Sequence, residues 1–188
     1  MTRIEVITSN PGKMREFKAA LEPLGYELSQ RSEDIEEIQA DDLEDVVRDC
    51  MAQLQSRGLC NYIIDDSGLF IDTLGGFPGV YSAYVLKTLG CQGIIKLLEG
   101  KGDRTAKFRC CIGCNAEGIG QIVVSAEAVG SIIREERGRG GFGFDPIFVP
   151  TGHDKTFSQL PLEEKNRISH RGKAINSLSE RLSERREK

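Results

Sequence analysis

The spacing of hydrophobic residues changes twice along this chain, and these changes restrict what it can fold into. Short apolar runs and helical patterns fill the first third. Residues 106–114 and 122–128 then show the two-residue alternation typical of β-strands, and the turn-forming sequence NAEGIG joins them. Helical spacing returns near position 162. Helices packed on a sheet with an antiparallel-leaning centre satisfy this order, so we predict a mixed α/β fold.

Local signals place the elements of the first third. Residues 3–8 have the composition of a short buried strand, and Asn10-Pro11 is typical of a helix start. A second helix is predicted from Asp41, with Glu44 completing a capping box. The apolar face of the first helix would carry Met14, Phe17, Leu21 and Leu24.

The remaining elements follow in the same way. We expect a strand at residues 61–65, a helix at 84–98 with a break near Gly90, and a third β-segment in the sequence SIIRE. Two helices are predicted at the carboxyl end, one at residues 162–168 and one from Ser169. The second would turn four residues inward: Ala174, Ile175, Leu178 and Leu182.

Composition excludes several classes of protein. The chain has 188 residues and no linker between two units, so we expect one domain over residues 1–188. Its net charge of -4 argues against nucleic acid as a partner. No run approaches the ~18 apolar residues of a membrane helix, and the amino end lacks a signal-peptide core. The six cysteines favour reduced, structural thiols and a cytoplasmic location.

The first candidate site is the segment Thr8, Ser9, Asn10, Pro11, Gly12 and Lys13 at a strand-to-helix junction. A helix amino terminus suits a phosphate, and Lys13 adds a positive charge in the first turn. The spacing does not match a Walker A loop. The alternative is a capped helix with a surface lysine.

The second candidate is Asp65-Asp66-Ser67-Gly68, which is expected directly after the strand at 61–65. Adjacent carboxylates at a strand end need a cation or solvent, and one aspartate could hold Mg²⁺ while polarising a water. The alternative is a solvated turn. A solvated face is the better explanation for most members of a further acidic group: Glu36, Glu37, Asp41 and Asp42.

Two later segments add candidates. In the loop at residues 140–146, glycines would let the backbone approach a ligand and Phe144 could stack on a base, although an ordinary turn fits equally. Lys165 could meet phosphate. His170 and Arg171 are hydrogen-bond donors that could read a carbonyl oxygen on a base, although a lone histidine is more often structural.

Together these segments resemble the inosine triphosphate pyrophosphatase family, which acts on non-standard purine nucleoside triphosphates. The matching segments run in the family's order: TSNPGK, EIQ, DDSGLFIDTLGGFPGVYSAY, GGFGFDPIF and EEKNRISHRGKA. The resemblance implies a long central mixed sheet whose flanking helices form two lobes around a nucleotide cleft. It also implies a homodimer and Mg²⁺-dependent cleavage of ITP, dITP and XTP to the monophosphate and pyrophosphate.

The resemblance also implies a role for each matching residue. Thr8, Asn10 and Lys13 would meet the phosphates, assisted by Lys165. Glu37 and Asp66 would hold the metal. Asp66 would also accept a proton from the attacking water, with Ser67 beside the substrate. The loop that would bind the base comprises Phe142, Gly143, Phe144 and Asp145. The purine carbonyl would be read by His170 and Arg171.

The chain departs from the family in its second helix. Many members carry a lysine there that points at the phosphates, whereas this stretch reads LEDVVRDCMAQLQ, with Arg48 as the nearest basic residue. The charge of Lys13 is therefore expected to matter more here.

Three alternatives remain at the level of sequence. A Maf-like pyrophosphatase of other base specificity shares the architecture, but the SHR and GGFGFDP sequences favour the purine group. A nucleotide-binding or structure-specific nucleic-acid module without catalysis is disfavoured by the acidic residues. A redox protein using Cys111 and Cys114 is disfavoured because this CxxC lies in a strand-like segment, whereas redox pairs open helices.

Overall fold

A seven-stranded sheet runs through the molecule in the order β2-β1-β3-β5-β6-β7, with β4 paired to β3. The computed structural model describes residues 2–186. The strands are β1 (Thr2–Ile7), β2 (Tyr26–Arg31), β3 (Tyr62–Ile71), β4 (Pro78–Gly79), β5 (Thr105–Ala116), β6 (Gly120–Ile132) and β7 (Phe148–Pro150). The helices are α1 (Pro11–Leu21), α2 (Leu43–Ser56), α3 (Ser82–Thr88), α4 (Gly90–Leu97), α5 (Leu162–Ile168) and α6 (His170–Arg186). Single turns of 3-10 helix are η1 (Glu22–Leu24), η2 (Asp72–Leu74), η3 (Asp145–Ile147) and η4 (Phe157–Gln159).

The sheet has a parallel half and an antiparallel half, which confirms the predicted mixed α/β fold. β1 pairs in parallel with β2 and with β3. β3, β5, β6 and β7 pair antiparallel in that order. The predicted alternating segments form the long hairpin β5–β6. The third β-segment expected in SIIRE is wrong, because Ser131 and Ile132 continue β6 and pair with β7.

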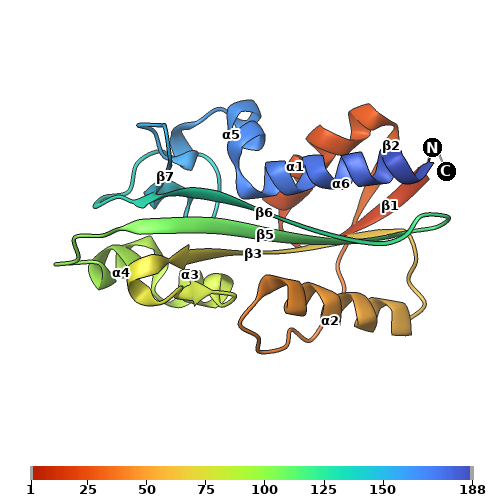
Figure 1. Ribbon diagram of the computed structural model, residues 1–188, viewed down its shortest axis with the longest axis horizontal. Helices are drawn as coiled ribbons and strands as arrows, with labels where there is room; N and C mark the ends of the chain where they lie inside the picture. The colour runs from red at the N-terminus through yellow and green to blue at the C-terminus, as the bar shows by residue number, and fades with distance from the viewer. Residues whose placement is uncertain (1, 187–188) are drawn as a thin grey trace.

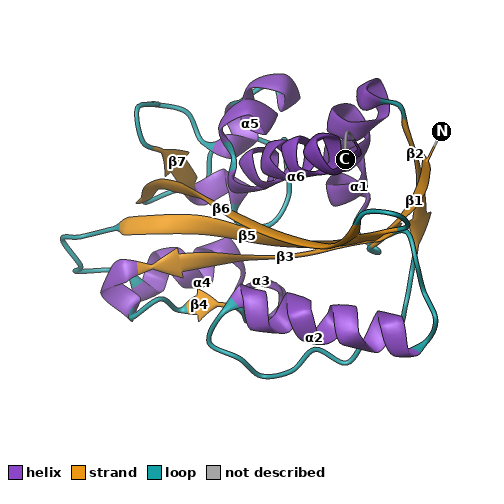
Figure 2. Ribbon diagram, turned by 45° about the vertical axis from the view of Figure 1, so that its right-hand side comes forward, coloured by secondary structure: helices purple, strands orange, loops and turns teal. Residues whose placement is uncertain are grey.

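Helices cover both sides of the sheet. In Figure 1, α1, α5 and α6 lie above it, and α2, α3 and α4 lie below; Figure 2 shows the same layers after a turn. The four residues predicted to turn inward from α6 are at most 1% exposed and join the core beneath α1: Ala174, Ile175, Leu178 and Leu182. On the other side, α2 buries its apolar stripe against β3 and β5.

The path of the chain around β1 creates a crevice. From β1 the chain passes through α1 above the sheet to β2, and from β2 it passes through α2 below the sheet to β3 (Figure 1). The carboxyl end of β1 is therefore a topological switch point, where open α/β sheets bind ligands. β1 pairs with β3 only as far as Ile7 opposite Ile64, and β3 continues beyond it. The crevice lies in this gap.

The strand predicted at residues 61–65 is longer than expected. Asp65–Gly68 lie inside β3, because β5 pairs with it continuously from Tyr62 to Ile71. Gly68 fits there because a Cβ would collide with the carbonyl oxygen of Gly79 on β4. The predicted end of the strand at residue 65 is therefore wrong, and so is the alternative of a solvated turn.

Other boundaries differ by smaller amounts. α2 is capped by Asp42, whose side chain accepts the Glu44 N–H at 2.8 Å, so the capping box from Asp41 does not form. Leu24 is 49% exposed in η1 and does not extend the buried face of α1. The helical segment at 84–98 breaks before Gly90, as predicted. Among the described residues, no helix is both long and apolar enough to cross a membrane.

Candidate active site

A cavity of about 410 Å³ occupies the crevice at the end of β1. The predicted segments, far apart in sequence, converge on it. The predicted residues that line it are Thr8, Ser9, Asn10, Lys13, Glu37, Asp66, Ser67, Phe142, Gly143, Phe144, Asp145, Lys165, His170 and Arg171. Pro11 and Gly12 belong to the same segment but do not line the cavity. A Cβ on Gly12 would come within 2.6 Å of the Phe142 ring, so this glycine makes room for Phe142.

The start of α1 is organised by its own cap. Asn10 Oδ1 accepts the N–H of Gly12 at 2.8 Å and that of Lys13 at 3.3 Å. Two amides that the sequence assigned to a phosphate are therefore engaged. The Lys13 side chain turns toward β3, where Nζ donates to the Asp65 carbonyl oxygen at 3.0 Å and lies 3.2 Å from Asp65 Oδ2.

The two adjacent aspartates lie in different surroundings. Successive side chains of a strand point to opposite faces of the sheet, so Asp65 and Asp66 face opposite ways. Burial raises the pKa of Asp65, but the charges and hydrogen bonds of Lys13 and Arg171 outweigh it and leave the pKa below its ordinary value. Burial raises the pKa of Asp66 to about 6, against the opposing charge of Lys13. The charges of Glu37 and Asp65 contribute less to this rise than burial does.

Asp66 keeps one oxygen available. Its Oδ1 accepts the Ser67 N–H at 2.8 Å, whereas Oδ2 makes no hydrogen bond to the described part of the chain. The charge of exposed Glu37 adds to the rise in the Asp66 pKa, which places the two carboxylates in one electrostatic environment. Within residues 2–186, no group of three metal-ligating side chains is found. A metal here would rely on these two carboxylates and on a ligand's own oxygens.

A buried network of six charged side chains forms the floor between α1, β3, α5 and α6. Arg171 is 2% exposed; its Nε donates to Asp65 Oδ2 at 3.0 Å and its Nη1 to Glu16 Oε2 at 2.8 Å. Lys165 is 3% exposed and donates to Glu16 Oε1 at 3.1 Å and to Asp145 Oδ2 at 2.7 Å. The members are Lys13, Glu16, Asp65, Asp145, Lys165 and Arg171. Three cations balance three carboxylates, as buried charges require.

Sequence reasoning missed Glu16 and the role of Asp65. Glu16 is a single acidic residue within an amphipathic helix, and only the packing of α1 against α5 and α6 shows that it is buried, at 3% exposure. Asp65 was treated as a neighbour of Asp66. The alternation of a strand would have separated the two, had the strand been expected to continue through them.

The two phenylalanines of the glycine-rich loop have different positions. Phe144, which the sequence suggested for base stacking, is 2% exposed and packs in the core at the edge of the cavity. Phe142 is half-buried, and its ring centroid lies 4.6 Å from Lys165 Nζ and 5.3 Å from Arg171 Cζ. These are cation–π distances. Of the two loop phenylalanines, Phe142 is therefore the one whose ring face lies near the charged floor.

His170 is a buried, neutral histidine. Its ring stacks on Phe108 with centroids 4.7 Å apart and planes 10° apart. Burial, together with the charges of Arg171 and nearby lysines, lowers its pKa well below the ordinary value. Its Nδ1 is buried without a hydrogen-bond partner in the described structure. An unpaired polar atom beside a cavity is suited to a ligand's polar group.

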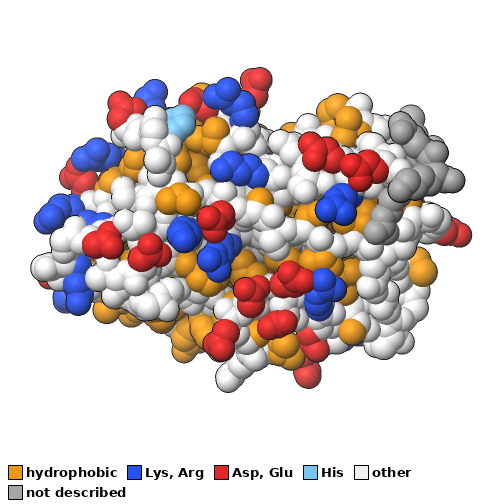
Figure 3. Space-filling view, in the orientation of Figure 1, with side chains coloured by type: hydrophobic (Ala, Val, Ile, Leu, Met, Phe, Trp, Pro, Cys, Tyr) orange, Lys and Arg blue, Asp and Glu red, His pale blue; other side chains and the backbone are white. Residues whose placement is uncertain are grey.

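The second helix presents a thiol to the cavity. Arg48 forms an exposed pair with Glu44 at 2.6 Å and does not line the cavity. Cys50 does line it, and burial raises the pKa of its thiol to about 12, with the charges of Glu37 and Asp66 adding to the rise. α2 therefore contributes no positive charge here. Figure 3 shows acidic side chains gathered over the part of the surface where α2 lies, and Glu36, Glu37, Asp41 and Asp42 are exposed, as expected.

The cysteines fit a structural role. All six are free. Cys111 and Cys114 are at most 1% exposed and belong to two different core clusters on opposite sides of β5. Burial raises the pKa of Cys111 to about 11 and that of Cys114 to about 12, so both thiols stay protonated at neutral pH.

Comparison with known proteins identifies the family. The model of the Ham1 family matches residues 4–181. The chain belongs to the Ham1 family. Two relatives named dITP/XTP pyrophosphatase are similar over nearly their whole length. The Thermococcus kodakarensis protein is 49% identical, covering 97% of this chain and 98% of the relative. The Pyrococcus horikoshii protein is 48% identical and covers 96% of each.

Solved Ham1 structures share the fold. The Staphylococcus aureus Ham1 protein superposes with a TM-score of 0.83 at 31% identity, covering 96% of this chain and 98% of that one. A HAM1 protein from Coxiella burnetii gives 0.81 at 33% identity, covering 98% and 100%. The resemblance inferred from the sequence motifs is thus confirmed for family and fold.

Proposed function

We propose that this chain hydrolyses the non-standard purine nucleoside triphosphates dITP, XTP and ITP to the monophosphate and pyrophosphate. The relatives' names support the substrate class. The observation that carries the proposal is the convergence of the predicted residues on one cavity, with Asp66 at its wall. A volume of about 410 Å³ falls within the range of small-molecule sites, ~300–1,000 Å³.

The triphosphate would lie at the end of β1. Thr8, Ser9 and Asn10 line the cavity there. Lys13, whose side chain is 19% exposed, is the most exposed cation of the charged floor and lies at this end. Phosphate oxygens would compete with Asp65 for Nζ. Lys165 lies deeper, between Glu16 and Asp145, and would act on the phosphates through the field of the charged floor.

Asp66 is suited to take a proton from the attacking water. A raised pKa of about 6 gives its carboxylate more proton affinity than an ordinary aspartate, yet keeps it largely ionised at neutral pH. Oδ2 is available, while the Ser67 N–H fixes Oδ1. Attack at the α-phosphorus would release pyrophosphate, and positioning with charge stabilisation supplies most of the catalysis in such reactions.

Glu37 and Asp66 would hold Mg²⁺. Both offer the hard oxygen ligands that this ion prefers, and Mg²⁺ is usually bound by one or two carboxylates together with substrate phosphates. Burial is the main cause of the raised pKa of Asp66, and the charge of Glu37 adds to it, a contribution that a cation would offset. When bound, Mg²⁺ supplies positive charge against the triphosphate, which matters more because α2 brings no lysine to the cavity.

The base would lie against the loop around Phe142. Arg171 has five N–H donors, of which three are used by Asp65, Glu16 and Ser67, so two remain. With its proton on Nδ1, neutral His170 would add a third donor. These donors would pair with the purine 6-oxygen and would be left unpaired against the amino group of adenine. Polar sites of this kind discriminate by ~10⁴ or more.

The proposal includes a homodimer in the cytoplasm. The dimer follows from the family resemblance, and free cysteines support a reducing compartment. The Maf-like alternative loses support because the matching family model is Ham1. A non-catalytic module loses support because the relatives are named as enzymes. Buried thiols on opposite faces of β5 argue against the redox alternative.

Hydrolysis of ITP, XTP, dITP, GTP and ATP with and without Mg²⁺ tests this function. The expected products are the monophosphate and pyrophosphate, identified by phosphorus NMR, with activity lost on chelation and restored by Mg²⁺. Release of a diphosphate and orthophosphate would refute attack at the α-phosphorus. Mg²⁺-dependent binding of ITP without turnover would favour the non-catalytic module.

A further inference from the structure

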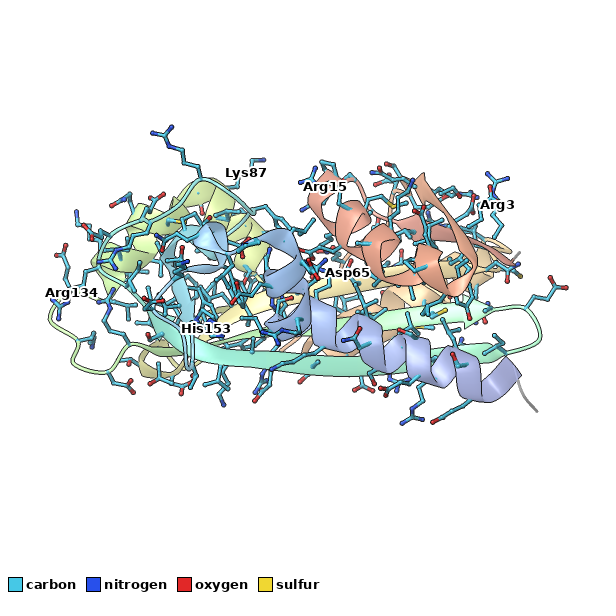
Figure 4. All side chains as sticks on the ribbon, turned by 90° about the horizontal axis from the view of Figure 1, so that it is seen from above. Arg3, Arg15, Asp65, Lys87, Arg134 and His153 are labelled. Carbon is cyan, nitrogen blue, oxygen red and sulfur yellow. The ribbon has the colours of Figure 1, made fainter. Side chains whose placement is uncertain are left out.

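Asp65 lies where the two ends of the cavity meet. Its side chain is fully buried, at 0% exposure, and Oδ2 is 3.2 Å from Lys13 Nζ and 3.0 Å from Arg171 Nε. Lys13 belongs to the first turn of α1 and Arg171 to the first turn of α6. Figure 4 shows Asp65 in the middle of the molecule beside these helices. One carboxylate oxygen thus joins the cation of the phosphate end to the cation of the base end.

The connection continues to the base loop. Arg171 and Lys165 share the two oxygens of Glu16, at 2.8 and 3.1 Å. Lys165 also pairs with Asp145 at 2.7 Å, and Asp145 accepts the Phe142 N–H at 2.8 Å. A continuous series of polar contacts therefore runs from Lys13 to Phe142. Because its charges balance, removing any one partner leaves a buried charge unpaired, which is costly.

Occupation of one end must affect the other. A phosphate that draws Lys13 away from Asp65 leaves Arg171 as the cation held by that carboxylate. Asp65 has no second oxygen contact to compensate, because its Oδ1 is buried without a hydrogen-bond partner in the described structure. Coupling of this kind is reciprocal, so the base end must also affect the phosphate end.

We propose that Asp65 is a positioning residue that holds Lys13 and Arg171 and thereby couples phosphate binding to base selection. The inference rests on the proposed function, which assigns these two cations to the two parts of the substrate. Asp65 acts through Lys13 and Arg171, and its carboxylate sets where both of them lie.

Asp65→Asn tests the proposal with two readouts that move in opposite directions. The variant keeps the shape but removes the charge, so Arg171 loses its anchor and Lys13 loses its neutralising partner. The ratio of kcat/KM for ITP to that for ATP should fall by about tenfold to a hundredfold, the worth of a hydrogen bond to a charged group. Inhibition by pyrophosphate, a probe of the phosphate end, should become several-fold tighter. A merely structural role would not tighten pyrophosphate binding.

Cys110→Ala is the matched control. Cys110 is buried and its Sγ lies 3.9 Å from Asp65 Oδ2, so this change disturbs the same part of the core, removes only a weak thiol contact and does not alter charge. Its selectivity ratio and pyrophosphate inhibition should match those of the wild type. Should Asp65→Asn fail to fold, Ser67→Ala removes the hydroxyl that accepts from Arg171 Nη2 at 2.8 Å and donates to Asp65 Oδ2 at 3.3 Å, and it leaves no charge unpaired. Its ratio should fall about threefold or more, but less than in Asp65→Asn, because only one partner of the Arg171–Ser67 bond is charged.

The outcomes separate this inference from the function beneath it. A wild type that releases no pyrophosphate from ITP overturns the proposed function and this inference together. This inference alone is overturned if the wild type is active and Asp65→Asn keeps the wild-type ratio of kcat/KM values. It is also overturned if pyrophosphate inhibits Asp65→Asn more weakly than it inhibits the wild type. When only Ser67→Ala can be purified, an unchanged ratio overturns it.

Discussion

At the scale of single residues, the pKa values of the adjacent carboxylates Asp65 and Asp66 are shifted in opposite directions. The pKa of Asp65 is lowered because two cations outweigh its burial, and that of Asp66 is raised to about 6 because burial outweighs Lys13. The cause is the pleat of β3, which points the two side chains to opposite faces. Asp65 is thereby suited to organise cations, and Asp66 to exchange a proton.

The raised pKa of Asp66 predicts a stability cost at neutral pH. The folded chain binds this proton more tightly than the unfolded chain, so the group stabilises the fold below about pH 3.8 and loses that contribution as pH rises through about 6. The side chain introduced by Asp66→Asn does not ionise, so the stability of this variant lacks that dependence on pH. At pH 7.5, with metal ions removed by a chelator, the free energy of unfolding of the variant should exceed that of the wild type by on the order of 2–3 kcal/mol. This difference should be seen as a Tm several degrees higher.

The same pair of proteins supplies the control for this prediction. At pH 3.5 the difference in Tm should largely vanish, because Asp66 is then protonated in both states. An Asp66→Asn variant that is less stable than the wild type at pH 7.5 would contradict the raised pKa.

At the scale of elements, α1 carries the phosphate end on a capped amino terminus. Asn10 Oδ1 holds the first two free amides of the helix, and Lys13 extends from that turn to β3. The cap therefore fixes the position of the Lys13 backbone, from which the side chain extends. α2 has a similar cap, in which Asp42 accepts the Glu44 N–H, but Asp42 does not line the cavity.

These two caps offer a matched pair of variants. Asn10→Ala and Asp42→Ala should each lower the free energy of unfolding by about 0.5–2 kcal/mol, the usual worth of a helix cap, measured by urea denaturation. Only Asn10→Ala should lower kcat/KM for ITP, by about tenfold or more, because a displacement of about 1 Å at a binding group is costly. Equal losses of activity in both variants would show that the cap of α1 has no special role.

The elements also show how far sequence reasoning reaches. Long periodic segments such as the β5–β6 hairpin and α6 were predicted correctly, because their alternation is strong. β2 was missed because it is a sheet edge with few buried residues, Tyr26 and Leu28. Continuation of β3 through polar Asp65–Ser67 was missed because Lys13 of α1 and Arg171 of α6, which neutralise Asp65, are distant in sequence. For the same reason motifs located the site residues but not the network that joins them.

At the scale of the whole molecule, the site exists because the two halves of the sheet diverge. In the parallel half, β1 ends beside the middle of β3. In the antiparallel half, β3 continues past the end of β1 and stays paired with β5. Helices from both ends of the chain, α1 and α6, meet over this gap and bring their cations to one carboxylate. In the proposed function, one continuous cavity therefore serves both selection of the base and cleavage of the triphosphate.

Competition between ITP and ATP in a single reaction tests this account most directly. With equal concentrations of both nucleotides and excess Mg²⁺, the initial rates of formation of the two monophosphates give the ratio of their kcat/KM values, independent of the active fraction. The account predicts that IMP forms at least about a thousandfold faster than AMP, since the site pairs with a 6-oxygen and leaves donors unpaired against adenine. Equal rates of formation would contradict it.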